Sequence, residues 1–214
     1  MKYPILPSGA EASGQIWTGD SVRRLLPWQP STWPPADPDP LSFWVDFEFI
    51  VEESILTEIE NVITDAQKAN GSLKHRGYVI ALALLCAVDT LASYAYEDVE
   101  ASECKCCHRK DKIRPRFKKY IENFFPEDYK PHAEALYALY RNSIVHSWHL
   151  FKAGLLPEEE RIQVIDGVVC FGLKHLFWAL EESFKNFKKQ FENDTNVQRS
   201  VMHRYSDLRS SARP

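Results

Sequence analysis

The spacing of apolar and polar residues predicts helices over most of the chain between Leu41 and Asn193. From 41 to 69, apolar residues recur every third or fourth position, which is the spacing of one helix face. The segment 76–98 is apolar on nearly every side, so we expect it to be the most deeply buried helix. The same periodicity predicts three further helices, over residues 115–125, 131–151 and 173–191.

A short β-hairpin is expected between the last two helices. Two β-rich runs, 161–165 and 168–171, flank the pair Asp166-Gly167, and Asp-Gly between such runs is typical of a tight hairpin turn. The predicted fold is therefore all-α: an antiparallel helical bundle with one possible small hairpin.

The two ends of the chain differ from this helical region. Eight of the thirteen prolines precede residue 41, together with Trp17, Trp28 and Trp33. Proline restricts φ and removes amide donors, so residues 1–40 are expected to form an extended arm on an apolar surface. The interpretation has three parts: this arm, a bundle over 41–193, and a basic tail over 194–214.

Composition narrows the class of protein. With 44% hydrophobic and 26% charged residues, the chain is suited to globular folding. The longest uncharged apolar run, Tyr78–Val88, is shorter than the roughly 20 residues that a bilayer requires, so no membrane span is expected. An odd number of cysteines, five, and an N-terminus without an apolar signal core favour the reducing cytoplasm.

The charges are distributed unevenly. Residues 41–65 carry seven acids and no Lys or Arg, whereas residues 105–119 carry eight basic residues and a single acid. A local positive field attracts polyanions even when net charge is negative. The alternative is an ordinary solvated helix face and loop. The cations considered for RNA binding are Lys110, Lys112, Arg114, Lys118 and Lys119.

The helix expected over 131–151 carries the most specific chemistry. Asn142 and His146 are one turn apart on the same face, and His149 extends that stripe. Arg141 lies about 140° around the helix from His146, so only its long side chain would reach the imidazole. A guanidinium binds phosphate through two hydrogen bonds, and imidazole transfers protons near neutral pH. The alternative is that these residues only hold the helix to its neighbours by hydrogen bonds.

Arg141-Asn142-x-x-x-His146 resembles the Arg-x(4–6)-His signature of the HEPN superfamily, the higher eukaryotes and prokaryotes nucleotide-binding domains. The resemblance covers about residues 76–151 and includes Leu84–Leu91, Arg116–Pro126 and Leu136–His146. It implies a helical bundle that dimerises across the face bearing the motif. Many members are metal-independent RNA endonucleases in toxin–antitoxin or other defence systems.

The resemblance also implies roles for these residues. Arg141 would stabilise charge on the scissile phosphate, His146 would be the general acid or base, and Asn142 would orient either. The expected partners are RNA, a second copy of the chain in a homodimer, and an antitoxin or regulatory protein. The alternative is a non-catalytic HEPN-like module that binds nucleotides or assembles with proteins.

Asp89 lies in the middle of the most apolar helix, where an unpaired carboxylate is costly. It is therefore expected to be paired, neutral or at an opening. Arg141 and Arg116 are its candidate partners, and a structural pair is favoured over a catalytic acid.

Four potential metal ligands crowd into one loop, Cys104-Lys-Cys106-Cys107-His108. Zinc sites usually space two cysteines by two to four residues and place a second pair far away. This loop lacks that spacing, so oxidisable thiols are favoured over zinc there. With eight glycines in the chain and no Gly-rich phosphate loop, no cofactor is expected.

Overall fold

The computed structural model describes residues 40–70, 73, 76–97, 99–103, 110–140, 153–157 and 161–211. Its contacts divide the chain into two units, 1–38 and 39–214. Of the proline-rich arm predicted over 1–40, only Pro40 lies within the described residues. The second unit is predominantly helical with a small three-stranded sheet, in agreement with the predicted fold class.

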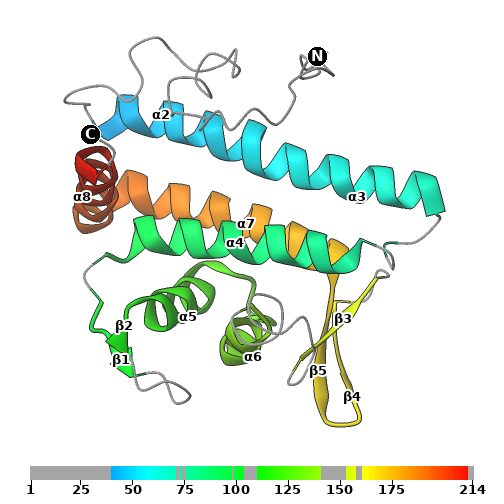
Figure 1. Ribbon diagram of the computed structural model, residues 1–214. Coiled ribbons are helices and arrows are strands. Elements are labelled where there is room, and N and C mark those ends of the chain that lie inside the picture. The colour runs from blue at the N-terminus through cyan, green and yellow to red at the C-terminus, as the bar shows by residue number, and fades with distance from the viewer. Residues whose placement is uncertain are drawn as a thin grey trace, which may run out of the picture. The chain divides into compact units, whose positions relative to one another are not determined.

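The first helical segment contains a change of helix type. It consists of α2 (Pro40–Ile50), the π-helical segment η1 (Val51–Leu56) and α3 (Thr57–Asn70). These three follow one another along a single long rod, drawn in blue and cyan in Figure 1. The predicted helix over 41–69 is thus confirmed in its extent. The π segment was not predicted, because apolar periodicity does not distinguish the two hydrogen-bond patterns over so few residues.

The central helix is α4 (Gly77–Ala95), and eleven of its residues are buried. It packs against α3, α5, α7 and α8. Figure 1 shows α4 beside α7 (Leu173–Asn193), between the α2–α3 rod above and the shorter helices and strands drawn below. The predictions of a buried helix over 76–98 and a last long helix over 173–191 are confirmed.

Helix α4 is also apolar enough to cross a membrane by length and composition. The mean hydropathy of its apolar stretch is 1.8, and half of that stretch is buried within the protein. The sequence argument counted only an uninterrupted uncharged run and therefore missed it. The packing of α4 against four other helices accounts for the same composition, since the core helix of a bundle is apolar all round.

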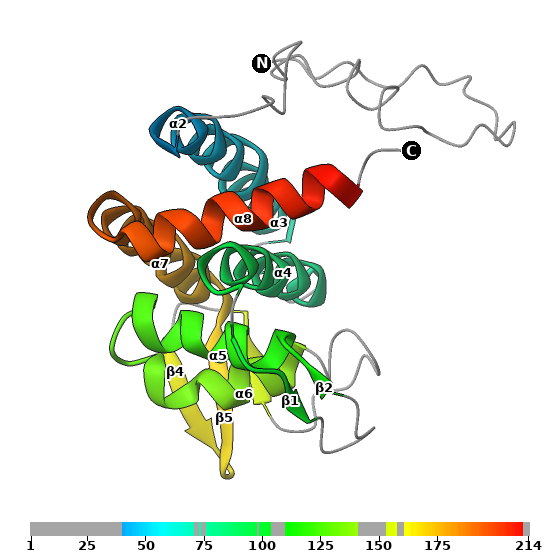
Figure 2. The ribbon, with the colours of Figure 1, turned by 90° about the vertical axis from the view of Figure 1, so that its left-hand side faces the viewer.

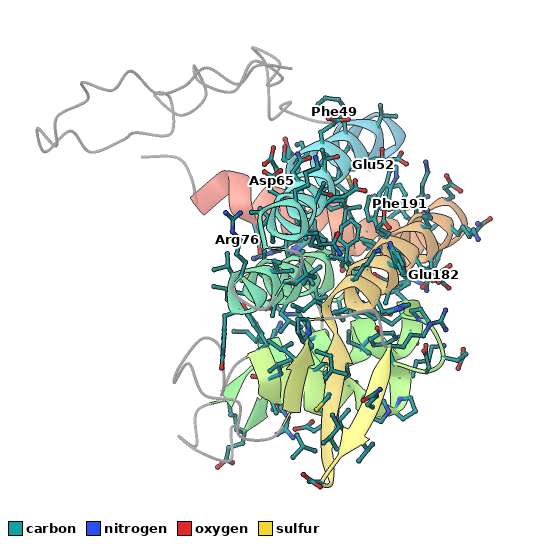
Figure 3. The ribbon with its side chains drawn as sticks, turned by 90° about the vertical axis from the view of Figure 1, so that its right-hand side faces the viewer. Phe49, Glu52, Asp65, Arg76, Glu182 and Phe191 are labelled. Atoms are coloured by element: carbon teal, nitrogen blue, oxygen red, sulfur yellow. The ribbon has the colours of Figure 1, made fainter. Side chains whose placement is uncertain are left out.

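Aromatic side chains join the α2 rod to α7. Trp44 stacks on Phe191 with ring centroids 4.2 Å apart, and it meets Phe187 edge-on at 5.3 Å. Figure 3 shows Phe191 directed to the interior, whereas Phe49 of α2 points outward. At the margin of this contact Lys188 of α7 donates to the Glu48 carboxylate, and that contact raises the pKa of Lys188.

The third layer contains α5 (Ile113–Phe124), the 3₁₀ turn η2 (Lys130–His132) and α6 (Ala133–Ala138). It confirms the helix predicted over 115–125 and the beginning of the one predicted over 131–151. A two-stranded ribbon not foreseen from the sequence precedes α5, with β1 (Ser102–Glu103) antiparallel to β2 (Lys110–Asp111).

The predicted hairpin is present. Strand β4 (Ile162–Ile165) pairs antiparallel with β5 (Val168–Gly172). Asp166 and Gly167 both have positive φ, 51° and 78°, as a type I′ turn requires. A further strand, β3 (Ala153–Leu156), lies parallel to β5 on its other edge, so the hairpin is part of a three-stranded sheet.

Most of the predicted basic tail over 194–214 forms a helix that was not predicted, α8 (Thr195–Ser211). Val197, Val201 and Tyr205 recur every fourth residue and are buried. Figure 2 shows α8 lying crosswise over the ends of the long helices. Three apolar residues at helical spacing are enough to dock this helix against α4 and α7.

We expect Leu84→Ala to lower the free energy of unfolding by about 2–5 kcal/mol, the range measured for removing a fully buried leucine. Leu84 has no exposed surface, and it lies in the core face of α4. The matched control is Leu82→Ala on the same helix, at a half-buried position, with a smaller loss. Urea unfolding followed by circular dichroism measures both; equal losses would contradict the central placement of α4.

Candidate functional site

The residues of the Arg-His motif lie outside the described part of the chain. Arg141, Asn142, His146 and His149 fall in 141–152, and the cysteine-rich loop falls in 104–109. The described residue directly before the motif is Tyr140, which is 7% exposed. Its contacts define where the motif segment begins in the bundle.

The ring of Tyr140 packs against α5, and its hydroxyl is hydrogen-bonded to α4. The ring stacks on Phe117 with centroids 5.6 Å apart and planes 11° apart. The hydroxyl donates to Asp89 Oδ2 at 3.4 Å and accepts from Cys86 Sγ at 3.8 Å. Tyr140, the last described residue before the motif, is therefore held against the stretch of α4 that carries Asp89.

Asp89 is half-buried rather than enclosed in the core. The expectation that it is paired is met by the Tyr140 hydroxyl, a residue the sequence argument had not considered. Of its two predicted partners, Arg141 lies outside the described residues. The Nε–H of Arg116 donates to the carbonyl of Lys112, four residues earlier, at 3.2 Å.

The predicted RNA-binding cations are gathered on β2 and α5, and several of them already have partners. Arg114 Nη2 and Lys118 Nζ both contact the Glu134 carboxylate, at 2.6 and 3.2 Å. Lys119 Nζ lies 4.5 Å from the centre of the Tyr96 ring. Two of these cations therefore share one acid. Lys110, in β2, is exposed.

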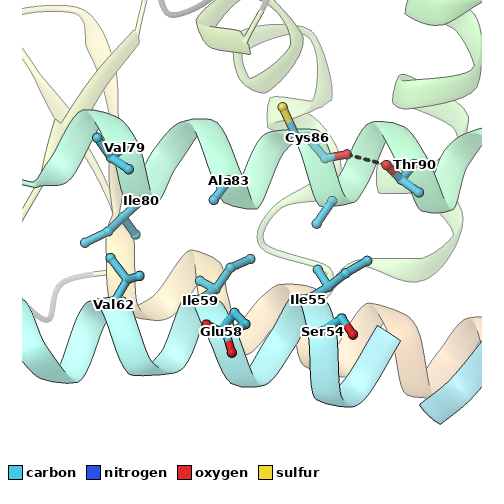
Figure 4. Close-up of a pocket in the computed structure, with 11 residues that line it drawn as sticks. Ser54, Ile55, Glu58, Ile59, Val62, Val79, Ile80, Ala83, Cys86 and Thr90 are labelled. Carbon is cyan, nitrogen blue, oxygen red and sulfur yellow. Dashed lines mark hydrogen bonds between the residues drawn. The ribbon is translucent and has the colours of Figure 1, made fainter. Parts of the chain in front are cut away.

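An apolar groove of about 330 Å³ lies between α4 and the rod formed by η1 and α3. Ile55, Ile59 and Val62 line one side, opposite Val79 and Ile80 of α4, as Figure 4 shows. The wall also includes Ala83, Cys86, Ala87 and Thr90. Cys86 borders this groove, but its sulfur points away from α3, and Tyr140 lies on that sulfur's side.

A second, more polar cavity of about 380 Å³ lies where α4 ends beside α5 and α8. Tyr96 lines it and accepts a hydrogen bond from Asn123 Nδ2 at 2.7 Å. Burial raises the pKa of Tyr96 to about 12, although the Asn123 hydrogen bond opposes the rise; the Asp194 carboxylate adds to it. Tyr96 is therefore a neutral phenol at physiological pH.

Beside this cavity, Glu97, His203 and Asp207 bring one ligand atom each to within 4.8 Å of one another. Among the described residues, these could hold a metal ion. Sequence reasoning did not find them, because Glu97 is 106 residues from His203. The only signal in the sequence is the pair His203 and Asp207, one helical turn apart.

No family model matches this chain, and neither the curated proteins nor the solved structures contain a match.

We expect Tyr140 and Asp89 to be energetically coupled, because a hydrogen bond to a carboxylate stabilises more than a neutral one. A double-mutant cycle with Tyr140→Phe, Asp89→Asn and the double variant should give a coupling free energy of about 1 kcal/mol. Chemical unfolding of all four proteins measures it. Strictly additive effects would mean that the hydroxyl contributes nothing to holding the start of the motif segment.

Proposed function

We propose that the protein is a metal-independent RNA endonuclease of HEPN-like arrangement, with Arg141, Asn142 and His146 at its active site. The observation that carries the proposal is the position of the motif, directly after Tyr140, whose ring and hydroxyl are fixed to α5 and α4. A catalytic segment needs such a rigid anchor, because small displacements of reacting groups are costly in rate.

The chemistry follows from RNA itself. The 2′-hydroxyl oxygen attacks the adjacent phosphorus and the bond to the 5′-oxygen breaks, giving a 2′,3′-cyclic phosphate and a 5′-hydroxyl. His146 either accepts the proton of the 2′-hydroxyl or gives one to the leaving oxygen. Arg141 stabilises the negative charge on the phosphate through its planar guanidinium. Asn142 orients the imidazole or the phosphate.

The basic face of β2 and α5 supports RNA as the substrate. Arg114 and Lys118 both lie on α5, where they contact the same acid, Glu134. Lys110 and Lys112 are exposed near the same end of α5. In this proposal these side chains guide the RNA backbone, and they provide no sequence specificity of their own.

A homodimer with a composite site is part of the proposal. The groove between α4 and the η1–α3 rod is apolar, and it reaches Cys86, which also contacts Tyr140. In this proposal a second copy covers the groove and contacts α4, the helix whose other side holds Tyr140. The enzyme would act in the cytoplasm, in a toxin-like or defence role, under the control of an antitoxin or regulatory protein.

The same groove favours a second candidate function, a non-catalytic module for nucleotide binding or protein assembly. An apolar groove on α4 serves assembly whether or not the motif cleaves RNA. In that case Arg141 and His146 would hold a ligand or stabilise the dimer. The two candidate functions predict different effects of removing the His146 imidazole on RNA cleavage.

Under the ribonuclease proposal, His146→Ala should lower the cleavage rate by about 10²–10⁴-fold, because proton transfer contributes that much. Folding and RNA affinity should change little. The measurement is cleavage of labelled RNA, with His175→Ala as the matched control, since that histidine lies against Trp178 in α7. Arg141→Lys should also cleave RNA more slowly, because an ammonium group lacks the planar pair of donors of a guanidinium.

Cleavage should persist in EDTA and should leave a 2′,3′-cyclic phosphate. Full activity of His146→Ala, or a strict requirement for added metal, would refute the ribonuclease. Unfolding of His146→Ala would make the residue structural and favour the assembly module.

For the dimer, Val79→Glu should convert the protein from dimer to monomer in sedimentation at micromolar concentration. Val79 is 57% exposed and lines the groove, so a carboxylate there would be buried by a second copy at high cost. Val164→Glu, at a 65% exposed position in β4, is the matched control and should remain dimeric. A monomeric wild type would remove the composite site from the proposal.

A further inference from the structure

One stripe of α8 is directed at the end of α4. Ser200, His203 and Asp207 are spaced by three and four residues, so they lie on one face of the helix. Ser200 Oγ donates to the Tyr94 carbonyl at 3.1 Å and accepts the Glu97 N–H at 3.1 Å. This hydroxyl fixes the register of α8 against the residues that follow α4.

The backbone of Glu97 is fixed by two hydrogen bonds, and its carboxylate faces His203. Its N–H is bound by Ser200, and its carbonyl accepts from Lys112 Nζ at 3.1 Å. Its side chain is 12% exposed, and Oε2 lies 2.5 Å from His203 Nδ1. The carboxylate and the imidazole are thus brought together from two elements distant in sequence.

We infer that Glu97, His203 and Asp207 form a binding site for a first-row divalent transition metal of the zinc type. Their ligand atoms all lie within 4.8 Å of one another. Around zinc, with bonds of about 2.0–2.2 Å, tetrahedral ligand atoms are about 3.4 Å apart. Reaching this spacing requires small side-chain rotations, and the side chains of His203 and Asp207 are exposed.

The ligand set selects the class of metal. One imidazole nitrogen with two carboxylate oxygens suits zinc and its first-row neighbours, whereas magnesium and calcium prefer oxygen ligands alone. Three protein ligands leave at least one coordination position for water. The polar cavity that begins at Glu97 provides space next to the site.

The local charge also favours a cation. The Glu97 and Asp207 carboxylates supply two negative charges beside the imidazole, and the Lys112 ammonium contacts the Glu97 carbonyl rather than its carboxylate. The competing explanation is an ion pair or hydrogen bond between His203 and Glu97 alone. That explanation gives Asp207 no role.

The inference is independent of the proposed ribonuclease. None of the three ligands belongs to the motif, and they join α8 to the end of α4. A metal bound here would hold α8 against the end of α4. RNA cleavage that persists in EDTA would support the ribonuclease, whatever the result at this site.

The test uses the full chain, freed of metal by chelation and dialysed, with Zn²⁺ as the probe in isothermal titration calorimetry. We expect one ion per chain and a higher midpoint of thermal unfolding. Co²⁺ in place of Zn²⁺ should give visible d–d absorption. His203→Ala and Asp207→Asn should each weaken binding by at least about tenfold, the lower end of what loss of even an outer-sphere partner costs.

Two controls make the result decisive. His175→Ala should bind Zn²⁺ like the wild type. A variant with Cys104, Cys106 and Cys107 changed to Ser should also bind normally, because the proposed site contains no cysteine. Absence of binding, unchanged binding in Asp207→Asn, or loss of binding confined to the cysteine variant would each overturn the inference. Asp207 is exposed, so its variant is suitable even if His203→Ala fails to fold.

Discussion

Because α4 is apolar on nearly every side, the protein has to cover it from several directions at once. Helices α3, α5, α7 and α8 each contact it, and these elements come from both ends of the described chain. At about 25 cal/mol per Å² of apolar surface removed from water, this shared burial is a dominant stabilising term. The arrangement of the other helices therefore follows from the need to surround one helix.

Three polar groups of α4 are found where this covering is incomplete. Cys86, Asp89 and Thr90 lie in the second half of the helix, and none of them is fully buried. Asp89 takes its hydrogen bond from Tyr140, at the entrance to the motif segment. The apolar groove and the hydrogen bond that holds Tyr140 thus lie on different sides of α4, and both depend on how α4 is packed.

Sequence periodicity was sufficient for the long helices and the hairpin, because each of these is a local pattern. It failed for β3 and α8, whose structure depends on distant partners. In β3, Gly154 is required because a Cβ there would overlap Cys170 Sγ on β5, a contact invisible in the sequence. In α8 the basic charge of the tail concealed three buried residues. The Glu97–His203 pair depends on the docking of α8 and was equally out of reach.

The two candidate sites are separated along α4 in a way that limits how they influence each other. Asp89 precedes the end of the helix at Ala95 by six residues, which is about 9 Å at 1.5 Å per residue. Physiological salt screens exposed charges over about 8 Å. A cation at Glu97 would therefore act on the motif segment mainly through packing. By holding α8 against the end of α4, the cation would reduce fraying of the helix that carries Asp89. It would thereby make the position of Asp89 better ordered, without changing the electrostatic potential there.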